Sequence, residues 1–214
     1  MLTEFMAVEE TSHLGRFPIK DTRSPIERLR ELYERLTEYE IDYVAAPLGS
    51  GSGGTQPIRK PAQILIDDRK TTCIDICVLG ASLCLRAGLH PYVVLVDNHA
   101  LLAVWVGDGE PGALANWNGA EQASRPEVTN GTTLAKNGIR KDLDDDGPIV
   151  LLDLTAATRN YPEAGDQPAS FEETLTSLDY SQLDSAKVCD AGALWTAGGV
   201  RGTDDRWAAE SQLF

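Results

Sequence analysis

The chain has 214 residues, which is enough for one domain of about 150 to 180 residues with a sizeable core, plus tails. Asp and Glu outnumber Lys and Arg by 33 to 19, and the net charge of −14 argues against a nucleic acid or an anionic membrane surface as the main partner. No basic start is followed by an apolar run, and no segment approaches about 18 consecutive apolar residues, so neither secretion nor a membrane span is expected.

The first part of the chain divides into an arm and a helix. Residues 1–24 lack clear periodicity and are predicted to form a loosely held arm. Ser24, followed by Pro25 at the first helical position and by Glu27, is typical of a helix start. The apolar residues then recur at intervals of three and four: Ile26, Leu29, Leu32, Tyr33 and Leu36. This spacing predicts an amphipathic helix that covers the core.

Short elements and a flexible loop are predicted next. Residues 41–46 fit a short strand, and the run GSGSGG at 49–54 is predicted to be a flexible loop. Pro61 is expected to open a short helix that ends near Asp68. The loop precedes a cysteine at the start of a helix, so it either borders a substrate cleft or is an ordinary surface loop.

Residues 73–87 are apolar nearly all round the helical wheel, which is typical of a helix enclosed by protein. Thr72 is predicted to cap it together with Asp75, and Gly88 to end it. Cys73 then lies in the first turn. Free backbone N–H groups and the positive end of the helix dipole favour a thiolate at that position.

The four cysteines, at positions 73, 77, 84 and 189, show no paired metal spacing. Three of them share one helix, where they are not easily bridged, so reduced thiols in the cytoplasm are expected. Cys77, Cys84 and Cys189 are interpreted as small buried hydrophobic residues.

A hairpin is predicted after this helix. His90 is expected in a loop before Pro91, residues 92–96 in a buried strand, Asp97 and Asn98 in a tight turn, and residues 99–106 in a second, antiparallel strand. His99 would therefore open a strand.

The remainder of the chain is predicted to carry one further strand and one or two helices. Residues 107–148 are rich in Gly, Asn and Asp and suggest a long surface excursion, with a fragment of structure at 114–117. Residues 149–154 predict a third strand, in which Asp153 needs a partner because a lone carboxylate among apolar residues is costly. Helices are expected to end near Gly192, followed by a tail from 193 to 214.

The segments TTCIDICVLGASLCLRAGLHPYVV, DNHALLAVWV and IVLLDLT resemble the transglutaminase-like branch of the papain-type cysteine enzymes. The similarity is greatest to bacterial transglutaminase-like domains, including those attached to certain large helicase-type proteins. This resemblance implies an α+β domain over residues 25–192, with a central nucleophile helix packed on an antiparallel sheet. It also implies that Cys73, His99 and Asp153 act as nucleophile, general base and orienting residue, and that no cofactor is needed.

Physical chemistry supports these roles independently. A thiolate–imidazolium pair at a helix start suits attack on an amide carbonyl, and Asp153 would select the tautomer of His99. The Cys73 backbone N–H is one candidate donor to the oxyanion, with Gln56 as the candidate for a second. Trp105 is interpreted as a core or cleft-wall aromatic, with a substrate platform as the less favoured role.

A calcium loop competes for the same aspartate. Asp142, Asp144, Asp146 and Gly147 fit the opening D-x-D-x-D-G, with Asp153 at the twelfth place. That place normally holds a glutamate, and acidic turns before strands are common, so no metal ligand is assigned.

Two classes of function stay open. The favoured one is a cytoplasmic cysteine enzyme that acts on amide bonds of a protein or peptide through an acyl-enzyme, as a protease rather than a deamidase or transamidase. The alternative is a catalytically idle domain that serves as a binding or scaffolding module in a bacterial multiprotein system, with residues 142–146 as its partner surface.

Overall fold

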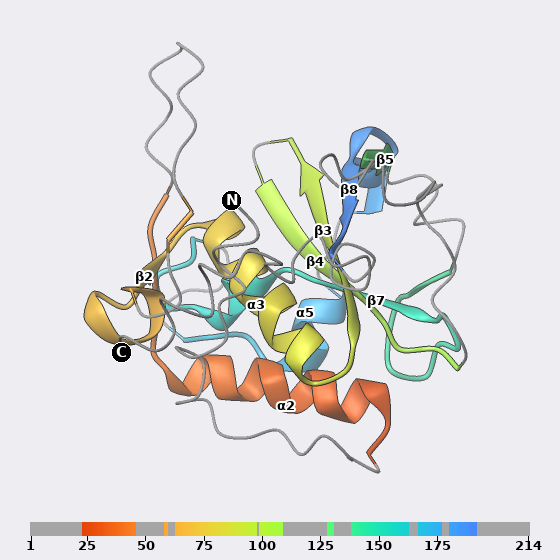
Figure 1. The fold of residues 1–214 in the computed structure, drawn as a ribbon, viewed down its shortest axis with the longest axis horizontal. Helices are drawn as coiled ribbons and strands as arrows, with labels where there is room; N and C mark the ends of the chain where they lie inside the picture. Colours follow the sequence, from red (N-terminus) through yellow and green to blue (C-terminus); the bar gives the residue numbers. More distant parts are fainter. Residues whose placement is uncertain are drawn as a thin grey trace, which may run out of the picture.

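A computed structural model describes residues 23–45, 58–59, 63–97, 99–108, 128–130, 138–162, 167–176 and 180–191 (Figure 1). These residues form an α+β structure in which helices cover a mixed six-stranded sheet of order β5-β8-β3-β4-β7-β6. A second, two-stranded sheet joins β1 (Asp42–Tyr43) to β2 (Lys70–Thr71) in parallel. In the described part of the chain, no helix combines the length and the apolar character needed to cross a membrane.

Helix α2 (Pro25–Glu38) begins where the sequence predicted. The Ser24 side chain accepts a hydrogen bond from the Glu27 backbone N–H, and the Glu27 carboxylate accepts one from the Ser24 N–H, so the capping box is complete. Of the predicted apolar stripe, Ile26 is half-buried against the core, and the other four residues are buried: Leu29, Leu32, Tyr33 and Leu36. The predicted covering helix is therefore confirmed.

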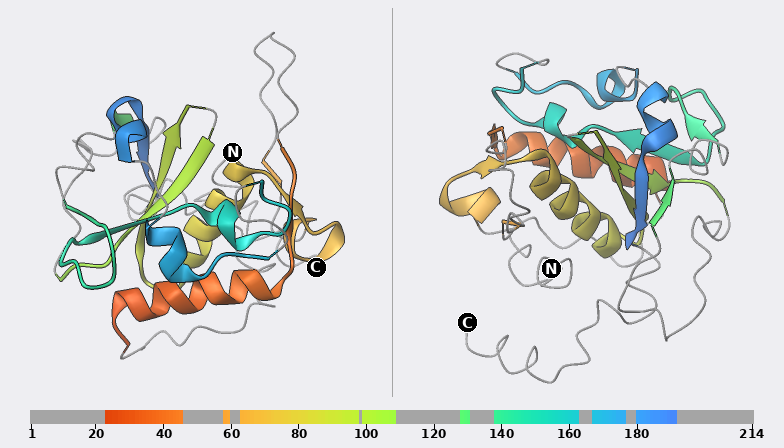
Figure 2. Two further views of the ribbon diagram at one scale, coloured as in Figure 1. Left: turned by 180° about the vertical axis from the view of Figure 1, so that it is seen from behind. Right: turned by 90° about the horizontal axis from the view of Figure 1, so that it is seen from above.

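Helix α3 (Cys73–Arg86) is the enclosed central helix that the sequence predicted. Thr72 and Asp75 form its capping box, and Gly88 follows the helix with a φ of 71°, a conformation that glycine adopts without strain. Every residue from Asp75 to Cys84 is buried. Figures 1 and 2 show α2 and α3 together on one side of the main sheet.

The strands of the main sheet are β3 (His90–Val96), β4 (His99–Trp105), β5 (Val128–Asn130), β6 (Ile139–Arg140), β7 (Ile149–Leu152) and β8 (Lys187–Asp190). The predicted hairpin is confirmed, because β3 and β4 pair antiparallel with Val96 opposite His99. The neighbour of β7 on its outer side, β6, runs parallel to it. The expectation of a purely antiparallel sheet is therefore wrong, and the sheet is mixed.

Two predictions about local structure need correction. Lys187–Asp190 was expected to continue a helix, but it pairs with β3 and β5 inside the sheet, with Val188 and Asp190 buried and Lys187 exposed. That alternation has a period of two, typical of a strand, but it is only four residues long. His90 was expected in a loop, but it begins β3 and bonds the Asp190 carboxylate at 2.7 Å.

Several shorter elements complete the described structure. They are the π-helical turn η2 (Gln63–Asp67), the 3₁₀ helix η4 (Leu154–Ala157), α5 (Phe171–Thr176) and the 3₁₀ helix η5 (Tyr180–Ser185). The loop at 49–54, the fragment at 114–117, most of the arm at 1–24 and the tail at 193–214 lie outside the described residues. The domain limits of 25–192 therefore stay a prediction.

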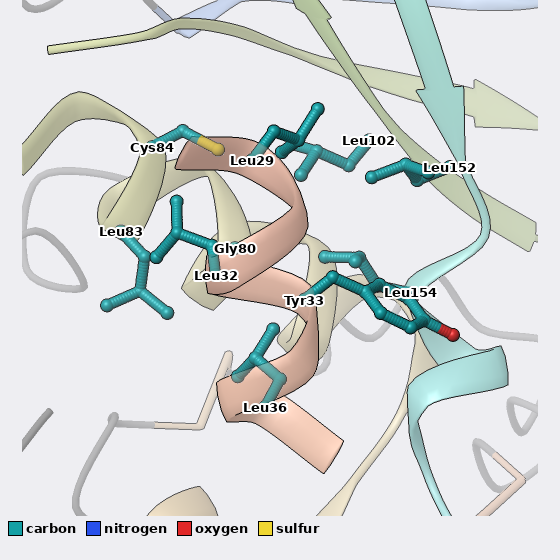
Figure 3. Close-up of a pocket in the computed structure, with 10 residues that line it drawn as sticks. All are labelled: Leu29, Leu32, Tyr33, Leu36, Gly80, Leu83, Cys84, Leu102, Leu152 and Leu154. Carbon is teal, nitrogen blue, oxygen red and sulfur yellow. The ribbon is translucent and has the colours of Figure 1, made fainter. Parts of the chain in front are cut away.

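The core between the helices and the sheet is closely packed at Gly80 of α3. A Cβ at Gly80 would lie 2.3 Å from Cδ1 of Leu154 and 3.2 Å from Cδ2 of Leu102. Leu154 follows Asp153 directly, so this contact holds the end of β7 against the central helix. Beside this contact, residues of α2, α3, β4, β7 and η4 line a small apolar pocket (Figure 3): Leu29, Leu32, Tyr33, Leu36, Gly80, Leu83, Cys84, Leu102, Leu152 and Leu154.

Candidate active site

Helix α3 and strands β4 and β7 meet at their ends, at one end of the strands of the main sheet. Cys73 is the first residue of α3, His99 is the first residue of β4, and Asp153 directly follows β7. Because β4 and β7 are antiparallel neighbours, with Leu102 opposite Leu152, the start of β4 lies beside the end of β7. The sheet register therefore decides that the histidine and the aspartate meet.

The three predicted side chains are in contact. His99 Nε2 lies 3.0 Å from Asp153 Oδ2, and the side chains of these two residues are only 20% and 12% exposed. The Cys73 side chain lies close enough to the His99 ring to raise the pKa of the imidazole. Since Nε2 is engaged by the carboxylate, Nδ1 is the ring nitrogen left for the sulfur. The imidazole therefore bridges a thiol and a carboxylate.

The Asp153 carboxylate is held from both sides. Its Oδ1 accepts bonds from the Thr155 backbone N–H at 2.9 Å and from the Thr155 hydroxyl at 2.5 Å, so Asp153 also caps η4. Its Oδ2, which faces His99, accepts a further bond from the Tyr161 hydroxyl at 3.2 Å. These three bonds fix the orientation of the carboxylate toward the imidazole.

Neither Thr155 nor Tyr161 was assigned a site role from the sequence. Thr155 belongs to the Asp-x-Thr pattern in the segment IVLLDLT, and that pattern is a signal by which its role as a partner of Asp153 can be found. For Tyr161 we find no local pattern, because its contact depends on how the chain folds back after η4.

The electrostatics of the site favour a charged histidine. Burial of the His99 ring works against its charged form, but the hydrogen bonds with Asp153 and Cys73 and the negative charges of both outweigh it and raise the pKa of His99 from 6.5 to about 10. Burial would raise the pKa of the Asp153 carboxyl, but its bonds with His99 and Thr155 hold that pKa below the usual 3.8. At neutral pH the site therefore holds an imidazolium next to a carboxylate.

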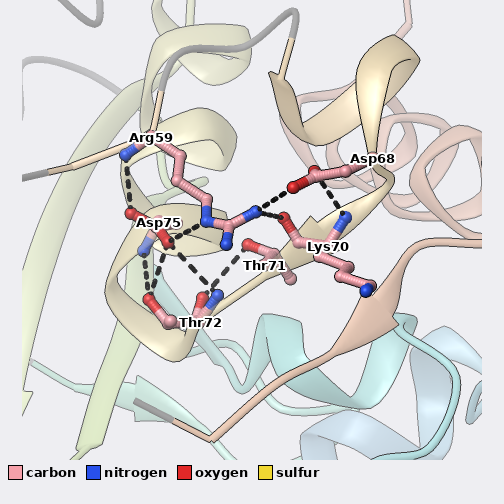
Figure 4. A network of polar contacts seen from close by, with 6 residues as sticks. All are labelled: Arg59, Asp68, Lys70, Thr71, Thr72 and Asp75. Carbon is pink, nitrogen blue, oxygen red and sulfur yellow. Dashed lines mark hydrogen bonds and ion pairs between the residues drawn. The ribbon is translucent and has the colours of Figure 1, made fainter. Parts of the chain in front are cut away.

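The start of α3 is fastened by a second polar network (Figure 4). The Asp75 carboxylate, in a residue only 1% exposed, accepts bonds from the Thr72 hydroxyl at 2.8 Å and from the Arg59 backbone N–H at 2.9 Å. The Arg59 guanidinium lies 3.9 Å from Asp75 and also bonds Asp68 at 2.7 Å. Arg59 thus balances the buried Asp75 carboxylate, two residues from Cys73, and fastens the start of α3.

The other three cysteines are poor nucleophiles. Cys77 is fully buried, and its thiol donates to the Ala100 carbonyl at 3.1 Å. Burial raises the pKa of the Cys77 thiol well above its ordinary value, that of Cys84 to about 12 and that of Cys189 to about 11. The prediction of buried thiols is confirmed for Cys77 and Cys84, while Cys189 is half-buried like Cys73.

Two predicted site residues do not join the triad. Trp105 is at the opposite end of β4 from His99, roughly 20 Å away along the strand. Its indole N–H donates to the Gly107 carbonyl at 3.0 Å, and its ring packs against the apolar cluster on the sheet face opposite α3. The interpretation of Trp105 as a core aromatic is therefore confirmed, and its distance from His99 gives no support to a substrate role at the triad. Gln56 lies outside the described residues.

The acidic turn has a structural use of its own. Asp142 Oδ1 accepts the backbone N–H groups of Asp144 and Asp145, each at 2.9 Å, while Asp153 faces His99. Across the described ranges, no group of three or more His, Cys, Asp or Glu side chains is arranged to hold a metal ion. Asp153 therefore bonds His99 and not the acidic turn at residues 142–146.

A scan against models of protein families finds no match to this chain. Comparisons with curated proteins and with solved structures find no significant match either. The geometry of Cys73, His99 and Asp153, and the chemistry that it permits, is therefore what points to a function.

Proposed function

We propose that the chain is a transglutaminase-like cysteine enzyme of the papain type, which acts on amide bonds through a thioester acyl-enzyme. The observation that carries this proposal is the bridge from Cys73 through the His99 ring to Asp153 at the start of a buried helix. The finer fold assignment is part of the proposal. It is supported by the central helix α3, which presents its first residue at the edge of the sheet formed by β3, β4 and β7.

In the first step, the Cys73 thiolate attacks the amide carbonyl carbon and a C–S bond forms. The His99 imidazolium gives its proton to the departing nitrogen as the C–N bond breaks, and a thioester remains. In the second step, neutral His99 takes a proton from water, which attacks the thioester. The C–S bond breaks, the acid leaves, and the thiolate–imidazolium pair returns. Asp153 keeps the imidazole in the tautomer that both steps need.

The oxyanion of each tetrahedral intermediate forms beside the start of α3. The N–H groups in the first turn of a helix have no acceptor within the helix, so the backbone N–H of Cys73 is available as a donor there. Water and amines resolve the same thioester, so the triad serves proteolysis, deamidation or transamidation alike. We favour proteolysis of a protein or peptide in a bacterial cytoplasm over deamidation and transamidation.

The experiment is site-resolved alkylation of the native chain by iodoacetamide at pH 6.5, with each cysteine quantified by mass spectrometry. We expect Cys73 to react more than about tenfold faster than the other three thiols. Because burial also slows those thiols, the deciding comparison is His99→Ala, in which Cys73 should lose most of its excess rate. Slow reaction of all four thiols in the wild-type chain would contradict the enzyme and support the scaffolding alternative.

A proteolysis assay complements the labelling. The wild-type chain is incubated with a mixture of unmodified peptides, and products are identified by mass spectrometry. Cys73→Ala is the control, since it removes the sulfur without touching the other site residues. We expect products that gain one water at a peptide bond and that are absent with Cys73→Ala.

A further inference from the structure

Tyr161 touches two of the three triad residues. Its hydroxyl donates to Asp153 Oδ2, the same oxygen that faces His99 Nε2. Its ring lies nearly parallel to the His99 imidazole, with an interplanar angle of 21° and ring centroids 6.4 Å apart. A single side chain therefore bonds the carboxylate and lies beside the imidazole.

The chain places Tyr161 through contacts that are independent of the triad. The Arg159 guanidinium pairs with the Asp42 carboxylate at 3.0 Å, and the Tyr43 backbone N–H donates to the Arg159 carbonyl at 2.8 Å. Asn160 then takes a positive φ of 61°, which turns the chain back toward the site. The Tyr43 ring meets the Tyr161 ring edge-on, with centroids 5.2 Å apart. Tyr161 is thus held by strand β1 and by the turn that follows η4.

We propose that Tyr161 is a positioning residue that sets the strength of the Asp153–His99 pair and shields it from water. This inference rests on the proposed function, because it assigns Tyr161 a role in the Cys73–His99 ion pair. The charged or titratable groups that face the imidazole are the Asp153 carboxylate and the Cys73 thiol, with the Tyr43 phenol close to both. Through its hydroxyl, Tyr161 acts on the first of these groups.

The hydroxyl and the ring have opposite effects on the ion pair. By donating to Oδ2, the hydroxyl takes up part of the negative charge that Asp153 offers to the imidazolium. Thr155 still holds the other carboxylate oxygen, so loss of the hydroxyl leaves the carboxylate in place and strengthens its pull on the imidazolium. Loss of the ring, in contrast, admits water to the face of the imidazole and weakens the pair.

The test compares pH profiles of Cys73 alkylation by iodoacetamide in the wild type, Tyr161→Phe and Tyr161→Ala. Tyr161→Phe should move the midpoint of the profile to lower pH by roughly half a unit. Tyr161→Ala should move it to higher pH, toward the ordinary thiol value of about 8.5. A purely structural role for Tyr161 would move unfolding midpoints but would not move the two profiles in opposite directions.

Tyr92→Phe is the matched control. Tyr92 is fully buried on the opposite face of the sheet, and among the described residues its hydroxyl has no hydrogen-bond partner. Its alkylation profile should therefore superimpose on that of the wild type. If wild-type Cys73 reacts at low pH but the Tyr161→Phe profile is unchanged or moves to higher pH, the inference is overturned and the proposed function stands. An ordinary thiol profile in the wild type would instead overturn the proposed function and this inference with it.

Discussion

The Asp153 carboxylate accepts all four of its hydrogen bonds, from His99, Thr155 and Tyr161. Asp153→Asn replaces it by a carboxamide, in which only the oxygen is an acceptor. If the amide oxygen stays with Thr155, the NH₂ group faces His99 Nε2 and fixes the tautomer with its proton on Nδ1. That tautomer cannot take a proton from Cys73. If the amide turns over, its NH₂ group meets the N–H and hydroxyl of Thr155 instead. In either orientation, one of the two neighbours, His99 or Thr155, loses the acceptor oxygen that the carboxylate supplies.

The size of the effect follows from the loss of the imidazolium. An ordinary thiol with a pKa of about 8.5 is only about 1% ionised at pH 6.5, so alkylation of Cys73 should fall up to roughly 100-fold at that pH. A wrong tautomer in a triad lowers kcat by roughly 10⁴, equivalent to about 5 to 6 kcal/mol in the barrier. The unmet hydrogen bonds should reduce the free energy of unfolding by about 1 to 3 kcal/mol.

The assay measures the alkylation rate of Cys73 between pH 5 and 9, together with urea unfolding of each variant. Asp144→Asn is the control, because Asp144 is exposed and lies on the acidic turn away from His99. It should leave both measurements nearly unchanged, with or without a chelator. If the profile of Asp153→Asn superimposed on that of the wild type while the protein remained folded, Asp153 would not be the residue that orients His99.

Three further outcomes are expected. Cys73→Ala should abolish acyl transfer and leave the urea midpoint nearly unchanged. Cys77→Ala should lower the free energy of unfolding by about 1 to 3 kcal/mol and leave Cys73 reactive. Equal residual activities of the two variants would show that Cys73 is not the nucleophile. Gly80→Ala should destabilise the fold by about 1 to 3 kcal/mol, because the new Cβ meets the Leu154 side chain, and Leu154→Ala should partly rescue it. A wild-type urea midpoint for Gly80→Ala alone would contradict this close contact. The pKa of His99 is about 10 in the folded chain and 6.5 for an ordinary histidine. The stability that protonated His99 contributes should therefore be complete below about pH 6.5 and lost as the pH rises through about 10. Melting temperatures that fall in parallel for the wild type and His99→Ala would disprove this.

The helix starts and the hairpin could be predicted because they depend on neighbours in the sequence. The capping boxes at Ser24 and Thr72 join residues only three positions apart, and the turn between β3 and β4 joins adjacent strands. Cys73 and His99 were predicted for the same reason, since each opens an element whose pattern is clear. Local chemistry therefore determined which groups lie at the ends of elements.

Pairing between distant strands required the tertiary structure. The four-residue strand β8 has too short a pattern to be distinguished from the helix expected there, and only its pairing with β3 and β5 shows its conformation. The parallel pairing of β6 with β7 likewise depends on the path of the acidic turn at residues 141–148, which no local pattern gives. The sequence left open whether Trp105 belongs to the core or to a cleft wall, and its packing on the sheet face opposite α3 decided for the core.

The partners of the triad show the same division. The motif that contains Asp153 suggested its pairing with His99, but the 3.0 Å contact depends on the antiparallel register of β4 and β7. Tyr161 is placed by contacts between segments far apart in the chain, in which Arg159 bonds Asp42 more than a hundred residues away. Such contacts leave no periodic trace in the sequence, because their geometry exists only when the chain has folded.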